Sequence, residues 1–326
     1  MKKIIKLSTL CLLCTTLLSA EDKSFITKTT ENVTQAIENN KIYNFYAHTG
    51  ITNLKRDVNS INVDSETNTL YEVEAGVVLL PGTYDITLSY KTSFNNESTT
   101  DLSGNSIDSK AKNFTISANL LSNKDYGYID FEYSDIVLNG VAQRVGSNDT
   151  YILTRAGAAN GYKAMNVGDK MQTEEKLKTY TLGYRLPMMP NVGIVSTYVD
   201  RSLPAILDGI DNKTYIVENM TGTSLMYGIG YFDNLRKAPK NKPLLTKFAY
   251  MQGDLKTSGK DVKGINYDSK GSLSALMIEA GYKFSNFELL LGMKYANKKV
   301  DSNAAASTIA MDESELFTTV SIGMQF

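Results

Sequence analysis

Period-two alternation over segments of ten or more residues most limits what this chain can form. In residues 314–326, one face carries Leu316, Thr318, Val320, Ile322, Met324 and Phe326. The other face carries Glu315, Phe317, Thr319, Ser321, Gly323 and Gln325. Successive side chains of a strand point to opposite faces, so the segment predicts a strand with one apolar and one polar face. Globular strands are typically about 5–6 residues long, whereas a tilted strand that crosses a bilayer needs about 9–11.

Twelve such segments are predicted after Lys41, at residues 42–55, 69–80, 83–94, 110–121, 126–138, 175–186, 191–201, 222–234, 243–257, 271–284, 286–299 and 314–326. The connections alternate in length. The long ones are 56–68, 95–109, 139–174, 202–221, 258–270 and 300–313, and the short ones are 81–82, 122–125, 187–190, 235–242 and 285–286. This sorting predicts an all-β fold: a closed antiparallel transmembrane β-barrel of twelve strands (ten or fourteen are the alternatives), with short periplasmic turns and long extracellular loops.

The C-terminal residues also favour a barrel. After the N-terminus, no apolar run approaches the roughly 20 residues that a spanning helix needs. The terminal Phe326, preceded at alternate positions by Met324, Ile322 and Val320, resembles the assembly signal of bacterial outer-membrane barrels as a class. The resemblance covers residues 41–326. It implies a place in the outer membrane of a Gram-negative cell, with the membrane lipids and the barrel assembly machinery as partners.

The N-terminus has the pattern of a secretory signal peptide over residues 1–20. Lys2, Lys3 and Lys6 precede an apolar stretch, and cleavage is expected between Ala20 and Glu21. A buried first helix is the alternative interpretation. Residues 21–40 could form a short periplasmic helix or a disordered lead-in, and residues 41–326 form the barrel domain.

Composition excludes several kinds of site. Both cysteines, Cys11 and Cys14, lie in the predicted leader, so the mature chain has no disulfide and no thiolate metal site. One histidine, His48, excludes a multi-histidine metal site. Without the three leader lysines, 31 basic residues stand against 35 acidic ones, a net charge of -4 that does not suit nucleic acid. We expect no metal and no cofactor.

Two short connections predict strand registers. A two-residue turn at 285–286 pairs Phe284 with Phe287 and, on the opposite face, Lys283 with Glu288. A two-residue turn at 81–82 pairs Leu79 with Tyr84, Val77 with Ile86, and Glu72 with Lys91. Opposite charges across an antiparallel pair are favourable by about 0.2–1 kcal/mol, so both registers are consistent with a wet inner face.

The polar faces predict which side chains line the lumen. They are His48, Glu72, Glu74, Asp85, Lys91, Asp130, Glu132, Arg185, Lys247, Glu279, Lys283, Glu288 and Lys294. Asp130 and Glu132 have no predicted partner. These charges could select solutes, or they could be ion pairs that only fill a closed barrel.

The leading functional hypothesis is a porin-like outer-membrane channel for passive or modestly selective passage of small hydrophilic solutes. A closed barrel that binds a partner or surface through its long loops is the alternative. The longest connection, 139–174, could fold inward, stay at the surface, or contain an extra hairpin near 151–155. A lipid-modifying enzyme is a weaker third hypothesis. Outer-membrane phospholipase A uses a His-x-Ser-Asn-Gly stretch, whereas His48 is followed by Thr-Gly-Ile-Thr, and no other catalytic pattern is present. We therefore expect no enzymatic activity.

Deletion of Phe326 should lower the amount of folded barrel in the outer membrane, because the assembly machinery is expected to read this residue. The measurement is the gel-mobility shift between unheated and boiled samples. A truncated protein that keeps the full shift would contradict the prediction.

Overall fold

The computed structural model describes residues 43–59, 66–80, 85–95, 99–100, 105–123, 125–144, 151–152, 163–164, 167–208, 214–233, 241, 243–260, 266–304 and 307–325. The predicted leader, its cleavage site and segment 21–40 lie outside these residues, as does Phe326. Within the described ranges, no helix is both long and apolar enough to span a membrane.

The described residues form twelve long strands and three short ones. The long strands are β1 (Tyr43–Asn59), β2 (Glu66–Leu79), β3 (Ile86–Asn95), β5 (Asn105–Asn123), β6 (Gly127–Arg144), β9 (Lys170–Arg185), β10 (Val192–Asp208), β11 (Thr214–Phe232), β12 (Pro243–Lys260), β13 (Asn266–Phe284), β14 (Phe287–Ala304) and β15 (Ser307–Gln325). The short strands are β4 (Thr99–Thr100), β7 (Tyr151–Ile152) and β8 (Lys163–Ala164).

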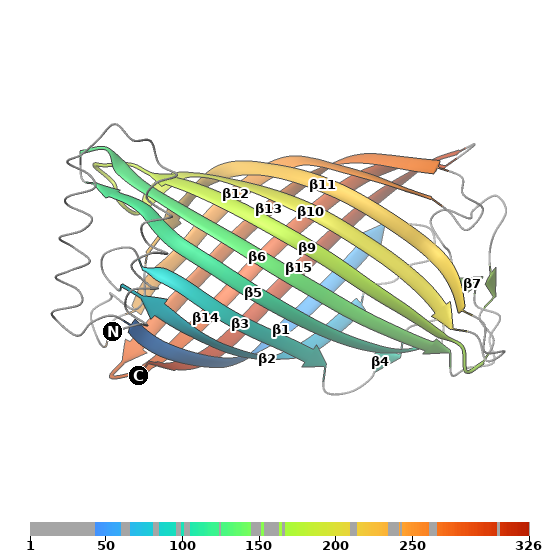
Figure 1. Ribbon diagram of the computed structural model, residues 1–326, viewed down its shortest axis with the longest axis horizontal. Helices are drawn as coiled ribbons and strands as arrows, with labels where there is room; N and C mark the ends of the chain where they lie inside the picture. Colours follow the sequence, from blue (N-terminus) through green and yellow to red (C-terminus); the bar gives the residue numbers. More distant parts are fainter. Residues whose placement is uncertain are drawn as a thin grey trace, which may run out of the picture.

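The long strands make one closed antiparallel ring. Each pairs with the next long strand along the chain, and β15 returns to pair with β1. Figure 1 shows the strongly tilted strands wrapped around a common axis. The predicted fold class, a closed antiparallel barrel, is confirmed, and its twelve strands are those counted in the described ranges.

Each predicted strand overlaps an observed one, but the observed strands extend further on the side of the long connections. The connection predicted at 300–313 is mostly strand, because β14 continues to Ala304 and β15 begins at Ser307. The connection predicted at 139–174 is also shorter, since β6 runs to Arg144 and β9 begins at Lys170. Between them β7 pairs with β8, and β7 lies beyond the ends of the long strands in Figure 1.

The register predicted for the 285–286 turn is confirmed. Phe284 pairs with Phe287, and Lys283 pairs with Glu288. Ser285 adopts a φ of 59°, the left-handed conformation that a tight two-residue hairpin turn requires. This turn therefore sets the inner and outer faces of β13 and β14.

The register predicted for the 81–82 turn is wrong by two residues. Leu79 pairs with Ile86, and Lys91 pairs with Glu74 instead of Glu72. The turn is wider than predicted: β2 ends at Leu79 and β3 starts at Ile86, and Asp85 N–H donates to Leu80 O at 3.3 Å. A shift of two residues keeps every side chain on its face.

The stagger of the ring gives its dimensions. A walk along directly paired residues that starts at Phe45 of β1 returns to β1 at Asn59, fourteen residues further along the strand. For twelve strands this shear corresponds to a strand tilt of about 40° and a backbone radius of about 12 Å. In the same geometry, moving one residue along a strand advances about 2.6 Å along the barrel axis. Moving to the directly paired residue of the next strand advances about 3 Å along the same axis.

The outer face carries a continuous apolar band. Its exposed members include Phe45, Ile51, Val73, Leu182, Ile194, Leu225, Ile229, Leu291, Val320 and Ile322. Tyr180 lies between Tyr133 and Tyr198, with ring centroids 5.1 and 6.3 Å apart, and Phe284 stacks on Phe287 at 5.7 Å near the short turns. The band rises about 20 Å from the short-turn end, comparable to the roughly 25 Å apolar belt of membrane barrels.

The last strand follows this arrangement. Val320 and Ile322 are about half exposed on the outer face, where they pair with Leu291 and Leu289 of β14. Met324 pairs with Phe287. These three residues of the predicted assembly signal therefore lie in the apolar band.

The register predicts unequal costs at neighbouring positions of β14. Leu289→Arg or Leu291→Arg places a charge in the apolar band and should lower the free energy of unfolding by about 2–4 kcal/mol near the band's middle and less at its edge. Leu290→Arg points inward, opposite Ser321 and Gly281, and should cost much less. Urea unfolding in lipid vesicles measures the difference, and equal losses at all three positions would show that the faces are wrong.

Candidate functional site: the barrel lumen

The barrel encloses a cavity of about 1750 Å³. Its lining begins beside the short turns, at Asp85 and Asn191, and continues to Arg201 and Lys298 in the upper half of the strands. A smaller cavity of about 260 Å³ shares part of this wall and includes His48. The lumen of this barrel is therefore not filled by the described side chains.

The structure places the predicted lining residues on the inner face. Those that line one or both cavities are His48, Glu72, Glu74, Asp85, Lys91, Asp130, Glu132, Arg185, Lys247, Glu279 and Lys294. Lys283 and Glu288 line neither cavity. They are buried as direct cross-strand neighbours near the short-turn end.

At the short-turn end, an arginine ties two strands and a turn together. Arg185 donates from Nε and Nη2 to the two carboxylate oxygens of Asp130, at 2.5 and 2.9 Å. Its Nη1 donates to Pro190 O at 2.8 Å, and its guanidinium lies 5.0 Å from the centre of the Tyr128 ring. The expectation that Asp130 has no partner is wrong. A two-point ion pair of this kind is geometrically specific.

The single histidine lies in a polar contact between the first strand and β14. His48 Nε2 is 3.3 Å from Glu288 Oε2, and its ring lies 5.1 Å from that of Tyr46. Tyr46 in turn donates to Glu74 at 2.9 Å. Gly323 pairs with His48, and a Cβ at this glycine would overlap the imidazole. The imidazole therefore occupies the space beside Gly323 of β15, inside the barrel.

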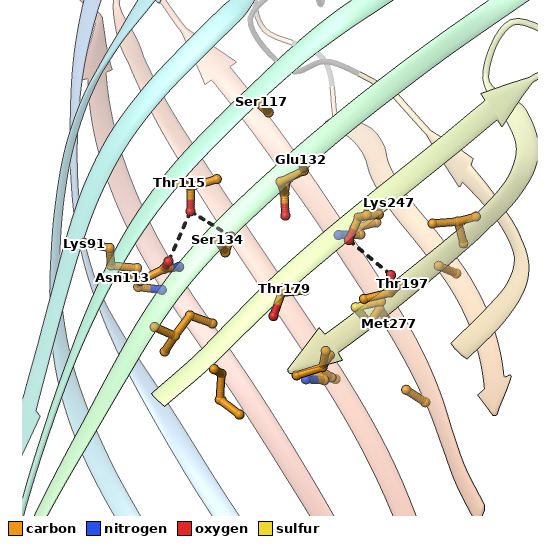
Figure 2. A pocket seen from close by; sticks show the side chains of 18 of the residues that line it. Lys91, Asn113, Thr115, Ser117, Glu132, Ser134, Thr179, Thr197, Lys247 and Met277 are labelled. Atoms are coloured by element: carbon orange, nitrogen blue, oxygen red, sulfur yellow. Dashed lines mark hydrogen bonds between the residues drawn. The ribbon is translucent and has the colours of Figure 1, made fainter. Parts of the chain in front are cut away.

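The middle of the lumen has a polar wall. Figure 2 shows Lys91, Asn113, Thr115, Ser117, Glu132, Ser134 and Thr179 on strands β3 to β9. Thr115 donates to Asn113 at 3.2 Å and shares a 3.0 Å hydrogen bond with Ser134. Lys91 Nζ forms a 2.8 Å ion pair with Glu72, the partner predicted for it, although the two are diagonal neighbours and not directly paired. This wall suits water and polar solutes.

The facing wall, on β10 to β13, is mostly apolar. It carries Val195, Met226, Ala249, Met251, Leu255, Leu273, Ala275 and Met277. The lysines at its edges lie over aromatic rings: Lys247 is 6.0 Å from the Phe232 ring centre, and Lys294 is 5.3 Å from that of Phe317. Sequence reasoning did not predict this apolar wall, because only charged inner residues were considered.

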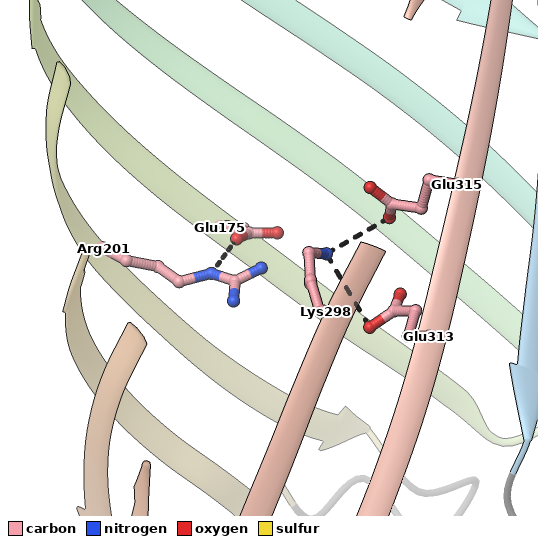
Figure 3. Close-up of polar contacts among 5 residues, drawn as sticks. All are labelled: Glu175, Arg201, Lys298, Glu313 and Glu315. Carbon is pink, nitrogen blue, oxygen red and sulfur yellow. Dashed lines mark hydrogen bonds and ion pairs between the residues drawn. The ribbon is translucent and has the colours of Figure 1, made fainter. Parts of the chain in front are cut away.

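Higher in the lumen lies a group that we call the upper charged layer: Glu175, Arg201, Lys298, Glu313 and Glu315. Arg201 Nε pairs with Glu175 on the β9–β10 wall. Lys298 Nζ lies 3.7 Å from Glu313 and 3.3 Å from Glu315 on the β14–β15 wall. Figure 3 shows the two groups pointing toward each other from opposite walls.

None of these five residues was among the predicted lining charges, although Glu315 was placed on the polar face of the last strand. Around Lys298 and Glu313 the sequence does not distinguish strand from loop. The reason is that their neighbours Lys299 and Asp312, which face outward, are also charged, so polar and apolar residues do not alternate there. The alternation that places Glu315 with Phe317 and Thr319 on the inner face was the available signal.

The described residues contain no group of three His, Cys, Asp or Glu side chains arranged to hold a metal ion.

No protein-family model matches the sequence, and no curated protein matches it either. Among solved structures, the translocator domain of autotransporter NalP from Neisseria meningitidis aligns at 10% identity and a TM-score of 0.43, over 94% of this chain and 97% of that one. The toluene transporter TodX of P. putida aligns at 10% identity and 0.37, over 87% and 90%. OmpT, an outer membrane protein of Vibrio cholerae, aligns at 11% and 0.27, over 87% and 97%. These values are too low to bear on what this chain does.

Asp130→Asn should weaken the short-turn end of the barrel, because Arg185 loses its ionised partner. We expect a loss of about 1 kcal/mol in the free energy of unfolding, since the pair is partly open to solvent. Glu132→Gln is the matched control two residues along the same face. Urea unfolding in vesicles compares the two, and equal losses would mean that the Arg185 contact contributes no stability.

Proposed function

We propose that this chain is an outer-membrane channel for passive or modestly selective passage of small hydrophilic solutes. The observation that carries the proposal is the cavity of about 1750 Å³, whose lining runs from the short turns to the upper half of the strands. A backbone radius of about 12 Å is wider than that of eight-stranded barrels, whose interiors side chains can fill.

The outer-membrane location is supported by the outer surface. A ring of exposed Leu, Ile, Val and Phe side chains would be unfavourable in water, and contiguous apolar surfaces of this size mark membrane or protein contacts. A closed ring satisfies every backbone hydrogen bond without an edge, which lipid requires. The predicted leader is consistent with export to that membrane.

The polar wall supports the hydrophilic part of the proposal. Lys91, Glu132 and the hydroxyl groups around Thr115 offer donors and acceptors to a solute that has shed part of its water. Ion pairs such as Lys91–Glu72 and Arg185–Asp130 reduce the net field that this lining produces. Charge selectivity should therefore be modest.

A second candidate is passage of solutes with an apolar portion, which the apolar wall favours. Met226, Met251 and Met277 present flexible, polarisable side chains to the cavity opposite the polar wall. Swelling of proteoliposomes separates the two candidates. Fast entry of a small sugar supports the hydrophilic channel, and entry of an aromatic alcohol without the sugar supports the second.

The purified mature protein should conduct ions in a planar bilayer with a weak preference for cations. The predicted lining has seven acidic and five basic residues, so carboxylates are in excess. The preference should fade at 1 M salt, where the screening length is about 3 Å. Glu132→Gln, which removes a carboxylate with no partner among the described residues, should shift the reversal potential toward anions.

Steady anion preference in the unmodified protein would refute this charge argument. A correctly folded barrel that conducts no current would favour the closed barrel with a surface-binding role. Before either conclusion is drawn, the gel-mobility shift between unheated and boiled samples must show that the barrel is folded.

A further inference from the structure

Three charged side chains in the middle of the lumen have no ion-pair or hydrogen-bond partner among the described residues: Glu132, Lys247 and Lys294. Glu132 comes from β6, whereas the two lysines come from β12 and β14. β6 and β14 are six strands apart in the ring of twelve long strands, so they lie on opposite sides of the cavity. From the shear and tilt of the strands, all three residues lie about 5–20 Å above the short-turn end, below the upper charged layer. Unpaired charges of opposite sign therefore face each other across one cavity.

We propose that this middle level of the lumen binds small zwitterionic solutes, namely short peptides with apolar side chains. The ammonium group of the peptide lies beside Glu132, and its carboxylate lies beside Lys247 and Lys294. The inference rests on the proposed channel function. It adds a binding site to that function and the chemical class of the solute that the site holds.

The surroundings of Glu132 leave its negative charge without a nearby cation. Its directly paired neighbours on β5 and β9 are Ser117 and Thr181. The next charge along the same face of β6, Asp130, is engaged by Arg185 through two hydrogen bonds. Hydroxyl groups donate and accept hydrogen bonds but carry no charge, so they do not neutralise the carboxylate.

Carboxylates are also in excess on the neighbouring strands of this side. Lys91 forms an ion pair with Glu72 and is directly paired with Glu74. The remaining basic side chain, His48, contacts Glu288. Among the described residues at this level, the wall from β1 to β6 therefore carries a net negative charge.

The balance is reversed on the opposite wall. Lys247 and Lys294 each lie over an aromatic ring, and both line the two cavities. One carboxylate, that of Glu279, is directly paired with Lys247 and diagonal to Lys294. Its Oε1 accepts a hydrogen bond from Thr246 at 2.6 Å, and within the described part of the chain it forms no ion pair with either lysine. Two ammonium groups therefore stand against one carboxylate.

The next carboxylate above these lysines belongs to the upper charged layer. Glu315 is diagonal to Lys294 on β15. It is, however, directly paired with Arg56 of β1 and lies 3.3 Å from Lys298 Nζ. Its charge is compensated within its own layer, so the wall below keeps an excess of positive charge.

The width of the ring determines the length of the solute. Opposite strands are about 24 Å apart, and Glu and Lys side chains each reach about 5–6 Å inward, which leaves about 13 Å between the opposed charges. A contact of about 3 Å at each end leaves about 7 Å for the solute itself. An extended peptide spans about 3.3–3.6 Å per residue, so a peptide of two or three residues reaches both walls.

The apolar wall lies beside the two lysines and accounts for the apolar side chains of the solute. Met226, Met251 and Met277 line the cavity on β11 to β13 at about the same height. Unbranched thioether side chains adapt to apolar groups of different shapes. Figure 2 shows Met277 among the lining side chains together with Lys247 and Glu132. Charge contacts at the two ends of a peptide and apolar contacts along it can therefore form at one level.

The first experiment compares four peptides on the unmodified protein: trialanine, N-acetyl-trialanine, trialanine amide and N-acetyl-trialanine amide. Each is added to a planar bilayer at about 0.1 M KCl, where the screening length is about 10 Å, and the fall in current gives a half-blocking concentration. Trialanine, the zwitterion, should block at a concentration about fivefold lower than either singly charged peptide, because each cap removes one charge contact. The uncharged peptide should block most weakly.

The second experiment assigns the two ends. Glu132→Gln should weaken block by trialanine and trialanine amide about fivefold and should not weaken block by N-acetyl-trialanine. Lys247→Gln with Lys294→Gln should weaken block by trialanine and N-acetyl-trialanine and should not weaken block by trialanine amide. Asp135→Asn and Lys299→Gln are the matched controls. They remove a carboxylate and an ammonium group from the outer faces of β6 and β14 and should change none of the four concentrations.

The third experiment tests the apolar wall. Trileucine should block at a lower concentration than triglycine, because its side chains bury apolar surface on the methionines. Met277→Gln should narrow this difference. Equal block by trileucine and triglycine in the unmodified protein would overturn the assignment of apolar side chains to the solute.

The outcomes separate this inference from the proposed function. A folded barrel that conducts no current overturns both. A conducting barrel whose current falls with none of the four peptides, or equally with all of them, overturns the inference and leaves the channel in place. Variants at Glu132 and at the two lysines that weaken every peptide alike also overturn it, because a general change of the lumen then accounts for the effect.

Discussion

Closure of the backbone hydrogen-bond ring is the constraint on which the other features of this barrel depend. An open sheet leaves a row of unpaired N–H and C=O groups at each edge, and in an apolar surrounding each would be costly. The pairing of β1 with β15 removes both edges. Once the ring is closed, the stagger of fourteen residues determines the tilt and the radius, and the radius determines how much space is left inside.

Closure also separates two environments that alternate residue by residue. Leu291 faces outward in the apolar band, whereas its neighbour Leu290 lies inside, and the same alternation separates Lys299 from Lys298. Interior charges are grouped at different heights and are mostly paired, as in Arg185–Asp130 near the short turns. Pairing limits the cost of keeping charges inside the ring.

The outline of the barrel was predictable from the sequence because a tight turn fixes register and alternation fixes faces. Ser285-Asn286 leaves one possible hairpin, and every pair derived from it is present. The segment from Leu80 to Asp85 permits several turns. The register predicted for β2 and β3 was therefore wrong by two residues. The partner of Asp130 was missed because β6 and β9 are joined by a long connection that does not specify their alignment. Lys298 and Glu313 were missed because both faces of the strands are polar at that height.

The seam between β1 and β15 has a consequence for the order of events during folding. Neighbouring strands elsewhere are close in sequence and can pair as hairpins, but this seam joins residues near the two ends of the described chain, such as Tyr46 and Gln325. Pairing over so long a separation is slow, because the intervening chain must be ordered first. The packing of His48 over Gly323 lies on that seam, and we expect it to form in the final step. A side chain at position 323 would therefore delay completion of the barrel more than it would alter the hairpins formed earlier.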